Sequence, residues 1–119
     1  MNLRLEQEKP NPSAENEKAW EAVFAKLEEF RKLEDDWDGD GSLAPSSEII
    51  EASIKLAERL KQTETPPHVE PSVNGTISFE WGTKDAFREI EVVSPAMVEE
   101  TTGRRGERTA TIVTRSIDE

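Results

Sequence analysis

The spacing of apolar residues changes once along this chain, and that change constrains the fold more than any other feature. Up to about residue 61 the apolar side chains recur every three or four positions, which is the period of an amphipathic helix. From residue 77 they alternate with polar side chains, as in a half-buried strand. Because the helical part precedes the strands instead of alternating with them, this order predicts an α+β fold.

The first helix is expected from Ala14 to Leu33, with Ser13 as its N-cap, and Trp37 could extend it by one turn. Its apolar stripe consists of Trp20, Val23, Phe24, Leu27, Phe30 and Leu33. The residues before it, 1–12, are polar and contain prolines that oppose an early helix, so we expect a flexible N-terminal arm there.

A second helix is expected to start at a cap formed by Ser46 or Ser47 and to end near Lys61. The segment Asp38-Gly39-Asp40-Gly41 separates it from the first helix, because glycine and aspartate both favour turns. Such a short connection between two amphipathic helices predicts that they pack as an antiparallel pair.

The second half is expected to form an antiparallel meander. A proline-rich loop covers residues 63–71, and Asn74-Gly75 predicts a hairpin with a type I′ turn, which needs positive φ at both central residues. Phe87 does not fit the alternation of its strand, so a bulge or a loop contact is expected there. The strands after the hairpin turn are expected around residues 77–81, 89–92, 97–102 and 107–114.

These elements predict two N-terminal antiparallel helices packed on one face of a four- to five-stranded antiparallel meander sheet. The length of 119 residues suits one domain. We therefore expect a single α+β domain over residues 13–119, with the helix pair in residues 14–61 and the sheet in residues 68–115.

The charge and composition of the chain exclude several classes of function. It has 15 Lys+Arg and 26 Asp+Glu, a net charge of -11, which argues against direct binding to a nucleic-acid backbone. It has no cysteine, which excludes disulfides, thiolate catalysis and Cys-ligated zinc. No apolar run approaches the ~18 residues of a membrane span. The first ten residues lack the apolar stretch of a secretory signal, so we expect a cytoplasmic protein without a membrane partner.

The densest acidic segment contains Glu34, Asp35, Asp36, Asp38 and Asp40. Within it, Asp36, Asp38, Asp40 and Gly41 match positions 1, 3, 5 and 6 of a calcium-binding helix–loop–helix loop. Position 12 would be Ser47 instead of the bidentate glutamate, and Pro45 interrupts the segment. The loop offers at most three carboxylates, whereas Ca²⁺ takes about six or seven oxygens, so we expect no metal site.

Catalytic signals are weak. His68 is the only histidine and lies between Pro67 and Val69, no serine lies in a Gly-x-Ser-x-Gly turn, and no glycine-rich loop opens a helix. We therefore expect no enzymatic activity, no catalytic residue and no cofactor. The alternative is a small metal-binding or enzymatic protein that uses the Asp36–Asp40 loop together with His68.

Aromatic and basic residues supply two further expectations. Trp20 and Trp37 are expected in the core of the helix pair, whereas Trp81, beside Gly82 at a strand end, could cover the core or anchor an interface. Three arginines at a hairpin tip form a small positive patch, which is more typical of a soluble loop than of a nucleic-acid site. They are Arg104, Arg105 and Arg108.

Residues 33–82 contain a Trp-Asp-Gly-x-Gly turn, a proline-rich loop and a Gly-x-Ile-x-Leu/Phe-Glu-Trp strand. This pattern resembles that of a family of small, mostly uncharacterised bacterial and phage proteins. The matching residues are Leu33, Trp37, Asp38, Gly39, Gly41, Pro67, Pro71, Gly75, Ile77, Phe79, Glu80 and Trp81. This chain departs from the pattern at Ser42-Leu43, which precedes Ala44. The resemblance implies a bacterial or phage setting and a structural role for the Trp-Asp-Gly turn, but no activity.

The function that these features predict is that of a non-enzymatic acidic protein-interaction module. An acidic surface accelerates encounter with a basic partner, here a protein such as a nuclease or repressor that itself binds nucleic acid; DNA mimicry is one form of this. The expected role is that of an inhibitor or regulator, for example phage anti-defence or antitoxin-like. The candidate partner-binding residues are Glu34, Asp35, Asp36, Asp38, Asp40 and Trp81.

Two other interpretations of the negative charge and of the open sheet remain. The negative charge could serve only to keep the protein soluble. An open meander leaves two edge strands, through one of which the chain could form a homo-oligomer.

Overall fold

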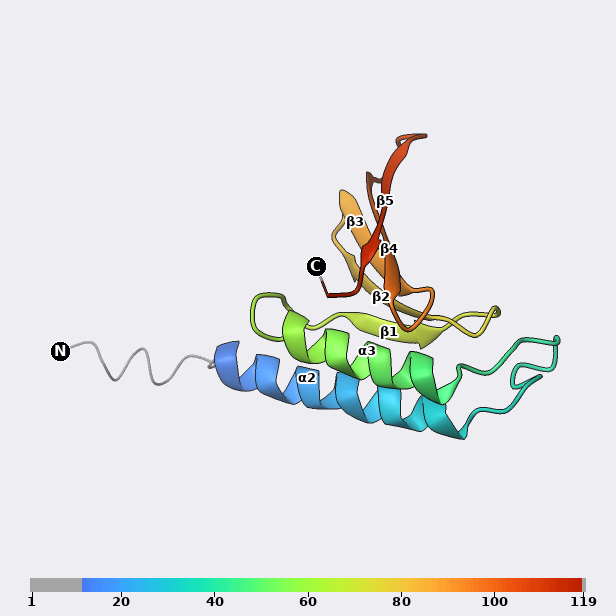
Figure 1. Ribbon diagram of the computed structural model, residues 1–119. Coiled ribbons are helices and arrows are strands. Elements are labelled where there is room, and N and C mark those ends of the chain that lie inside the picture. Colours follow the sequence, from blue (N-terminus) through green and yellow to red (C-terminus); the bar gives the residue numbers. More distant parts are fainter. Residues whose placement is uncertain (1–11, 119) are drawn as a thin grey trace.

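The computed structural model describes residues 12–118 of the chain. Its elements are, in order, helix α2 (Pro12–Glu29), 3-10 helix η1 (Phe30–Lys32), helix α3 (Ser47–Leu60) and strands β1 (His68–Pro71), β2 (Ile77–Gly82), β3 (Ala86–Val92), β4 (Met97–Arg104) and β5 (Ala110–Ser116). The two long helices lie side by side and antiparallel, and all strands belong to one sheet (Figure 1). The predicted α+β fold is confirmed, with five strands in the meander.

The first helix begins earlier than expected. Its first residue is Pro12, so Ser13 lies inside the helix and is not its N-cap. Proline suits this position because its fixed φ is helical and its missing N–H would have no intrahelical acceptor there. The rest of the expected arm, residues 1–11, lies outside the part of the chain that the structure describes.

Helix α3 confirms the predicted second helix. Ser46 is its N-cap, because the Ser46 Oγ accepts a hydrogen bond from the backbone N–H of Ile49 at 3.1 Å. The helix packs against both α2 and strands β2 and β3. Its buried residues are Ile49, Ile50, Ala52, Ser53, Leu56, Ala57 and Leu60.

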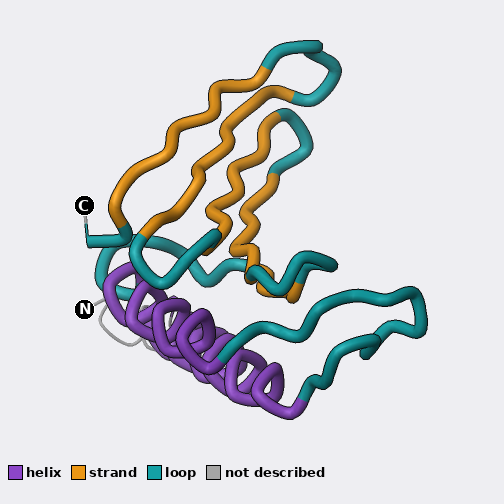
Figure 2. The backbone as a smooth tube through the Cα atoms, turned by 45° about the vertical axis from the view of Figure 1, so that its right-hand side comes forward, coloured by secondary structure: helices purple, strands orange, loops and turns teal. Residues whose placement is uncertain are grey.

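The sheet is an uninterrupted meander in which the strands pair antiparallel in the order β1-β2-β3-β4-β5 (Figure 2). Successive side chains of a strand point to opposite faces, so the register assigns every strand residue to one face. On the face that meets the helices, which we call the helix face, the buried residues are Val69, Ile77, Phe79, Ile90, Val92 and Val98. They form one core with Trp20, Leu27 and Leu56. The opposite face, which we call the open face, is covered by neither helix.

Two local predictions about the sheet are wrong. Asn74-Gly75 does lie between β1 and β2, but only Gly75 has a positive φ, of 82°, so the turn is not type I′. The connection is longer, closed by a hydrogen bond from the Ser72 N–H to the Thr76 carbonyl at 2.9 Å. Phe87 lies in regular register, opposite Gly82 and Gly103, without a bulge.

The aromatic ring of Phe87 covers Gly103 on the open face. A Cβ at Gly103 would come within 2.7 Å of that ring, so the absent side chain is what lets the ring lie there. An aromatic side chain packed over a cross-strand glycine is a known way of stabilising such a strand pair.

Within residues 12–118, neither helix has the length and apolar character needed to cross a membrane.

Candidate protein-interaction surface

The acidic loop between the helices, residues 34–44, is held together by its own carboxylates. Asp36 Oδ1 accepts a hydrogen bond from the Gly41 N–H at 2.7 Å, and Asp35 Oδ1 accepts one from the Ala44 N–H at 2.9 Å. Asp38 accepts hydrogen bonds from the Asp40 N–H at 3.0 Å and from both the N–H and the hydroxyl of Ser42. Aspartates commonly stabilise turns in this way.

The hydrogen bonds to Asp38 lower the pKa of its carboxyl below the usual 3.8, the one from the Ser42 hydroxyl contributing most. Asp36 itself takes a left-handed backbone conformation, with φ of 68°, which aspartate tolerates better than most residues. Three of the five candidate carboxylates thus shape the loop. For Glu34 and Asp40, the structure shows no side-chain hydrogen bond within the described part of the chain.

Trp37 lies within this loop and does not extend the helix. It lies in a turn, is only partly buried and is not part of the core, so both expectations for it are wrong. Its indole N–H donates to the Leu43 carbonyl at 3.0 Å, while the Leu43 N–H donates to the Val73 carbonyl at 2.9 Å. A backbone bridge from Leu43 to Asn74 therefore docks the loop on the turn between β1 and β2.

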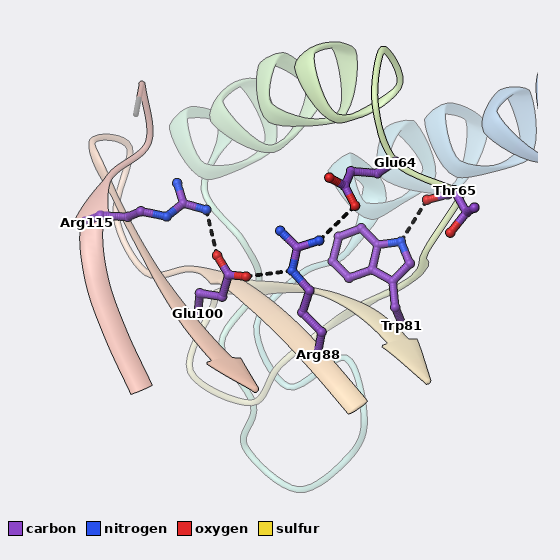
Figure 3. A network of polar contacts seen from close by, with 6 residues as sticks. All are labelled: Glu64, Thr65, Trp81, Arg88, Glu100 and Arg115. Atoms are coloured by element: carbon purple, nitrogen blue, oxygen red, sulfur yellow. Dashed lines mark hydrogen bonds and ion pairs between the residues drawn. The ribbon is translucent and has the colours of Figure 1, made fainter. Parts of the chain in front are cut away.

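Trp81 lies on the helix face, beside Arg88 (Figure 3), and packs against the core. Its indole N–H donates to the Thr65 carbonyl at 2.7 Å, and the guanidinium of Arg88 lies over its ring, 4.8 Å from the centroid. Trp20 is also in the core, at 2% exposure, as expected. Trp81 therefore covers one end of the core, and a role in partner binding stays a prediction.

Arg88 also begins a chain of ion pairs along the helix face. Its guanidinium donates to Glu64 at 2.8 Å and to Glu100 at 2.6 Å, and Glu100 accepts a further bond from Arg115 at 2.8 Å (Figure 3). Burial alone would raise the pKa of Glu100, but the bonds from Arg115 and Arg88 outweigh it and lower the pKa below its usual range. The charges on this face therefore neutralise one another.

The open face has a different electrostatic character. Glu70 of β1, Glu80 of β2, Glu89 and Glu91 of β3 and Glu99 of β4 all lie on it, because the register places each in an open-face row. The strand residues of this face include His68 but no lysine or arginine. We call these five glutamates the glutamate face.

Two pairs within the glutamate face stand directly opposite each other on neighbouring strands. Glu80 faces Glu89 across β2 and β3, and Glu91 faces Glu99 across β3 and β4. Opposed like charges destabilise a strand pair. Burial raises the pKa of Glu80 most, and the carboxylates of Glu70 and Glu89 raise it further. The ionised carboxylate of Glu80 therefore lowers the free energy of unfolding at neutral pH. This destabilisation disappears as the pH falls through the raised pKa of Glu80 and the carboxyl becomes protonated.

A shallow hollow of about 430 Å³ adjoins this surface. His68, Glu80, Phe87, Glu89 and Arg105 line it, together with Trp81, Gly82 and Arg88. The His68 ring lies 3.2 Å from Glu70, and Arg105 is tied to the Thr83 carbonyl at 2.8 Å. Within residues 12–118, no group of three His, Cys, Asp or Glu side chains is arranged to hold a metal ion.

The glutamate face is not among the residues singled out from the sequence. Its signal is the alternation of Glu80, Glu89 and Glu91 with buried residues, which indicates outward-facing positions. That signal shows which residues face outward on each strand, but only the register brings the five side chains onto one surface.

Comparison with known protein families, curated proteins and solved structures finds no match for this chain. The resemblance based on the Trp-Asp-Gly turn and the strand ending in Trp81 stays a prediction.

Proposed function

We propose that this protein is a non-enzymatic interaction module that binds a basic protein through the glutamate face. The observation that carries the proposal is that four neighbouring strands place five glutamates on one uncovered sheet face, where no strand residue is a lysine or arginine. From a turn, Arg105 brings a basic side chain to this face, beside Gly82 at one end. The hollow beside this face is shallow, and the described residues that line it form no arrangement that suggests catalysis. A broad charged face is suited to binding another macromolecule.

The directly opposed glutamates support a binding role. The pairs Glu80–Glu89 and Glu91–Glu99 place like charges directly opposite each other, which costs stability in the isolated protein. Glu91 offsets part of this cost by accepting a hydrogen bond from the Thr76 hydroxyl at 2.5 Å. Residues that break a local rule at a cost in stability are expected at functional sites. A partner with lysines or arginines opposite these pairs would remove the repulsion on binding.

The class of partner follows from this chemistry. A dense array of carboxylates resembles, to a cationic surface, the field of a nucleic-acid backbone. We therefore infer that the partner is itself a basic, nucleic-acid-binding protein, and that the module inhibits or regulates it. An anti-defence or antitoxin-like role in the cytoplasm of a bacterium is part of this proposal.

The acidic loop, which carries Glu34 and Asp40, is joined to the turn after β1 by the bridge from Leu43 to Asn74. Trp81 lies on the helix face, opposite the glutamates. A partner on the glutamate face would therefore contact Trp81 only through the hollow that Trp81 lines together with Glu80 and Glu89.

The test compares two variants that each remove three negative charges. The open-face variant carries Glu80→Gln, Glu89→Gln and Glu99→Gln. The helix variant carries Glu21→Gln, Glu29→Gln and Glu58→Gln, at exposed positions of α2 and α3. Each protein is immobilised and exposed at low salt to a lysate of its native host, and the retained proteins are identified.

We expect the wild type and the helix variant to retain the same basic protein, and the open-face variant to lose it. With the retained protein purified, binding should weaken by at least about tenfold between 50 and 200 mM salt. Equal retention by both variants would contradict a role for the glutamate face. A retained protein whose affinity ignores salt would contradict the electrostatic mechanism.

A further inference from the structure

Strand β5 leaves one side of its backbone without a partner strand. It is the last strand of the sheet, and no strand in the described part of the chain pairs with its outer edge (Figure 2). In Figure 1, β5 rises away from the helices together with β4, so neither helix covers that edge. Exposed strand edges present rows of N–H and C=O groups that can pair with another strand.

The side chains of β5 also favour pairing with another strand. Ile112 is 61% exposed and Val113 is 48% exposed, and the register places them on opposite faces. Between Ala110 and Arg115 the strand contains no proline, no glycine and no acid. Its central residues are Thr111, Ile112, Val113 and Thr114, all of them β-branched.

The other edge of the sheet is protected. Strand β1 has only four residues and ends at Pro71, which cannot donate a backbone hydrogen bond. The acidic loop adds a bridge from Leu43 to Asn74 at the end of β1. Short strands, prolines and covering loops are the usual protections of an edge, and β5 has none of them.

We propose that a second copy of this chain pairs with β5, strand to strand and antiparallel, around a two-fold axis at Val113. In this register Val113 of the two copies are opposite each other and Ile112 is opposite Thr114. Arg115 is opposite Thr111, so no two like charges meet within the paired strands. The pairing joins two five-stranded sheets into one continuous sheet.

Charge complementarity favours a second copy over an unrelated strand. The hairpin tip before β5 is basic, with Arg104, Arg105 and Arg108. Just past the other end of β5 the chain carries Asp118, which lines a groove with Glu48, Glu51, Lys55 and Arg59 of α3. Antiparallel pairing places the basic tip of each copy near the end of β5 in the other, which Asp118 follows.

This dimer does not depend on the proposed function. A two-fold axis perpendicular to the sheet leaves both glutamate faces on the same side, so the dimer would present a doubled acidic surface. Binding of a basic protein and pairing through β5 involve different surfaces of the molecule.

The test measures self-association by sedimentation equilibrium from about 5 to about 500 µM, because a small interface requires high concentration. We expect a reversible dimer. Val113→Lys places two ammonium groups opposite each other and should raise the dissociation constant by about 100-fold, since opposed like charges are strongly unfavourable at an interface. Val113→Glu should do the same. Val73→Lys, at an exposed valine on the other edge of the sheet, should leave the dimer intact.

Mixing Val113→Lys with Val113→Glu tests the register itself. Only when the two residues at position 113 face each other does the mixture form a heterodimer that neither variant forms alone. A wild-type protein that stays monomeric throughout, a dimer that survives Val113→Lys, or a mixture that stays monomeric would each overturn the proposal. Circular dichroism of each variant confirms that it is folded, so that loss of pairing is not loss of structure.

Discussion

Carboxylates that are close together in the sequence of the acidic loop have different roles in the structure. Asp38 accepts three hydrogen bonds and holds the turn together, whereas Asp40 contributes only its backbone N–H. Composition cannot distinguish the two, because both lie next to a glycine in the same segment. The distinction depends on which side chain reaches the N–H groups exposed by the turn.

Asp38→Asn should lower the melting temperature at pH 7 by a few degrees, because an amide accepts these hydrogen bonds less strongly than a carboxylate. The pKa of Asp38 is lowered in the folded state, so its stabilisation is present above the usual value of 3.8 and is lost as the pH falls through the lower folded value. The difference between variant and wild type should therefore shrink below about pH 4. Thermal unfolding followed by circular dichroism across pH measures this.

Asp40→Asn is the matched control and should leave the melting temperature almost unchanged. A comparable loss in both variants would indicate that the charge of the loop as a whole, and not the bonds to Asp38, stabilises it.

At the level of the elements, two adjacent glutamates of strand β4 have different electrostatic surroundings because they lie on opposite faces of the sheet. Glu99 lies on the open face opposite Glu91, whereas Glu100 lies on the helix face between Arg88 and Arg115. The two glutamates are neighbours in sequence, yet one is repelled by its surroundings and the other is attracted.

Glu100→Gln should reduce the free energy of unfolding by about 1–2 kcal/mol, because it removes a partly buried charge with two arginine partners. Glu99→Gln should be neutral or should raise the free energy of unfolding by about 0.5 kcal/mol, because it relieves an opposed like charge. Urea denaturation of both variants at pH 7 measures the difference. A larger loss for Glu99→Gln than for Glu100→Gln would mean that the faces are assigned wrongly.

On the scale of the whole molecule, the net charge of -11 is unevenly arranged. The helix face of the sheet carries paired charges, the open face carries opposed glutamates, and the tip before β5 carries arginines. Self-repulsion among like charges opposes the compact state and is weakened by salt.

Raising the salt concentration from about 20 to about 300 mM should therefore raise the melting temperature of the wild type by a few degrees. The increase should be smaller in the open-face variant than in the helix variant, although both lose the same charge. Differential scanning calorimetry at both salt concentrations measures this. Equal increases in the two variants would show that repulsion is spread over the surface and is not concentrated on the glutamate face.

Much of the fold can be predicted from the sequence because its signals are local. The apolar stripe from Trp20 to Leu33, the cap at Ser46 and the alternation from Ile77 to Trp81 each describe a few consecutive residues. The errors occur where a distant segment decides the outcome. Trp37 bonds to Leu43, which is itself held by the Val73 carbonyl of the distant β1–β2 turn, and Gly103 of the neighbouring strand leaves room for the ring of Phe87.

The sequence by itself therefore determined the helices, the strands, their order and the acidic character of the protein, since periodicity, caps and charge can be recognised without knowledge of distant contacts. Only the tertiary structure decided which carboxylates share a surface. Strand pairing aligns residues from Glu70 to Glu99 on one face, and a shift of one residue would send any of them to the other. It also decided that β5, and not β1, has an open edge, because the order of strands and the docking of the acidic loop determine which backbone is covered.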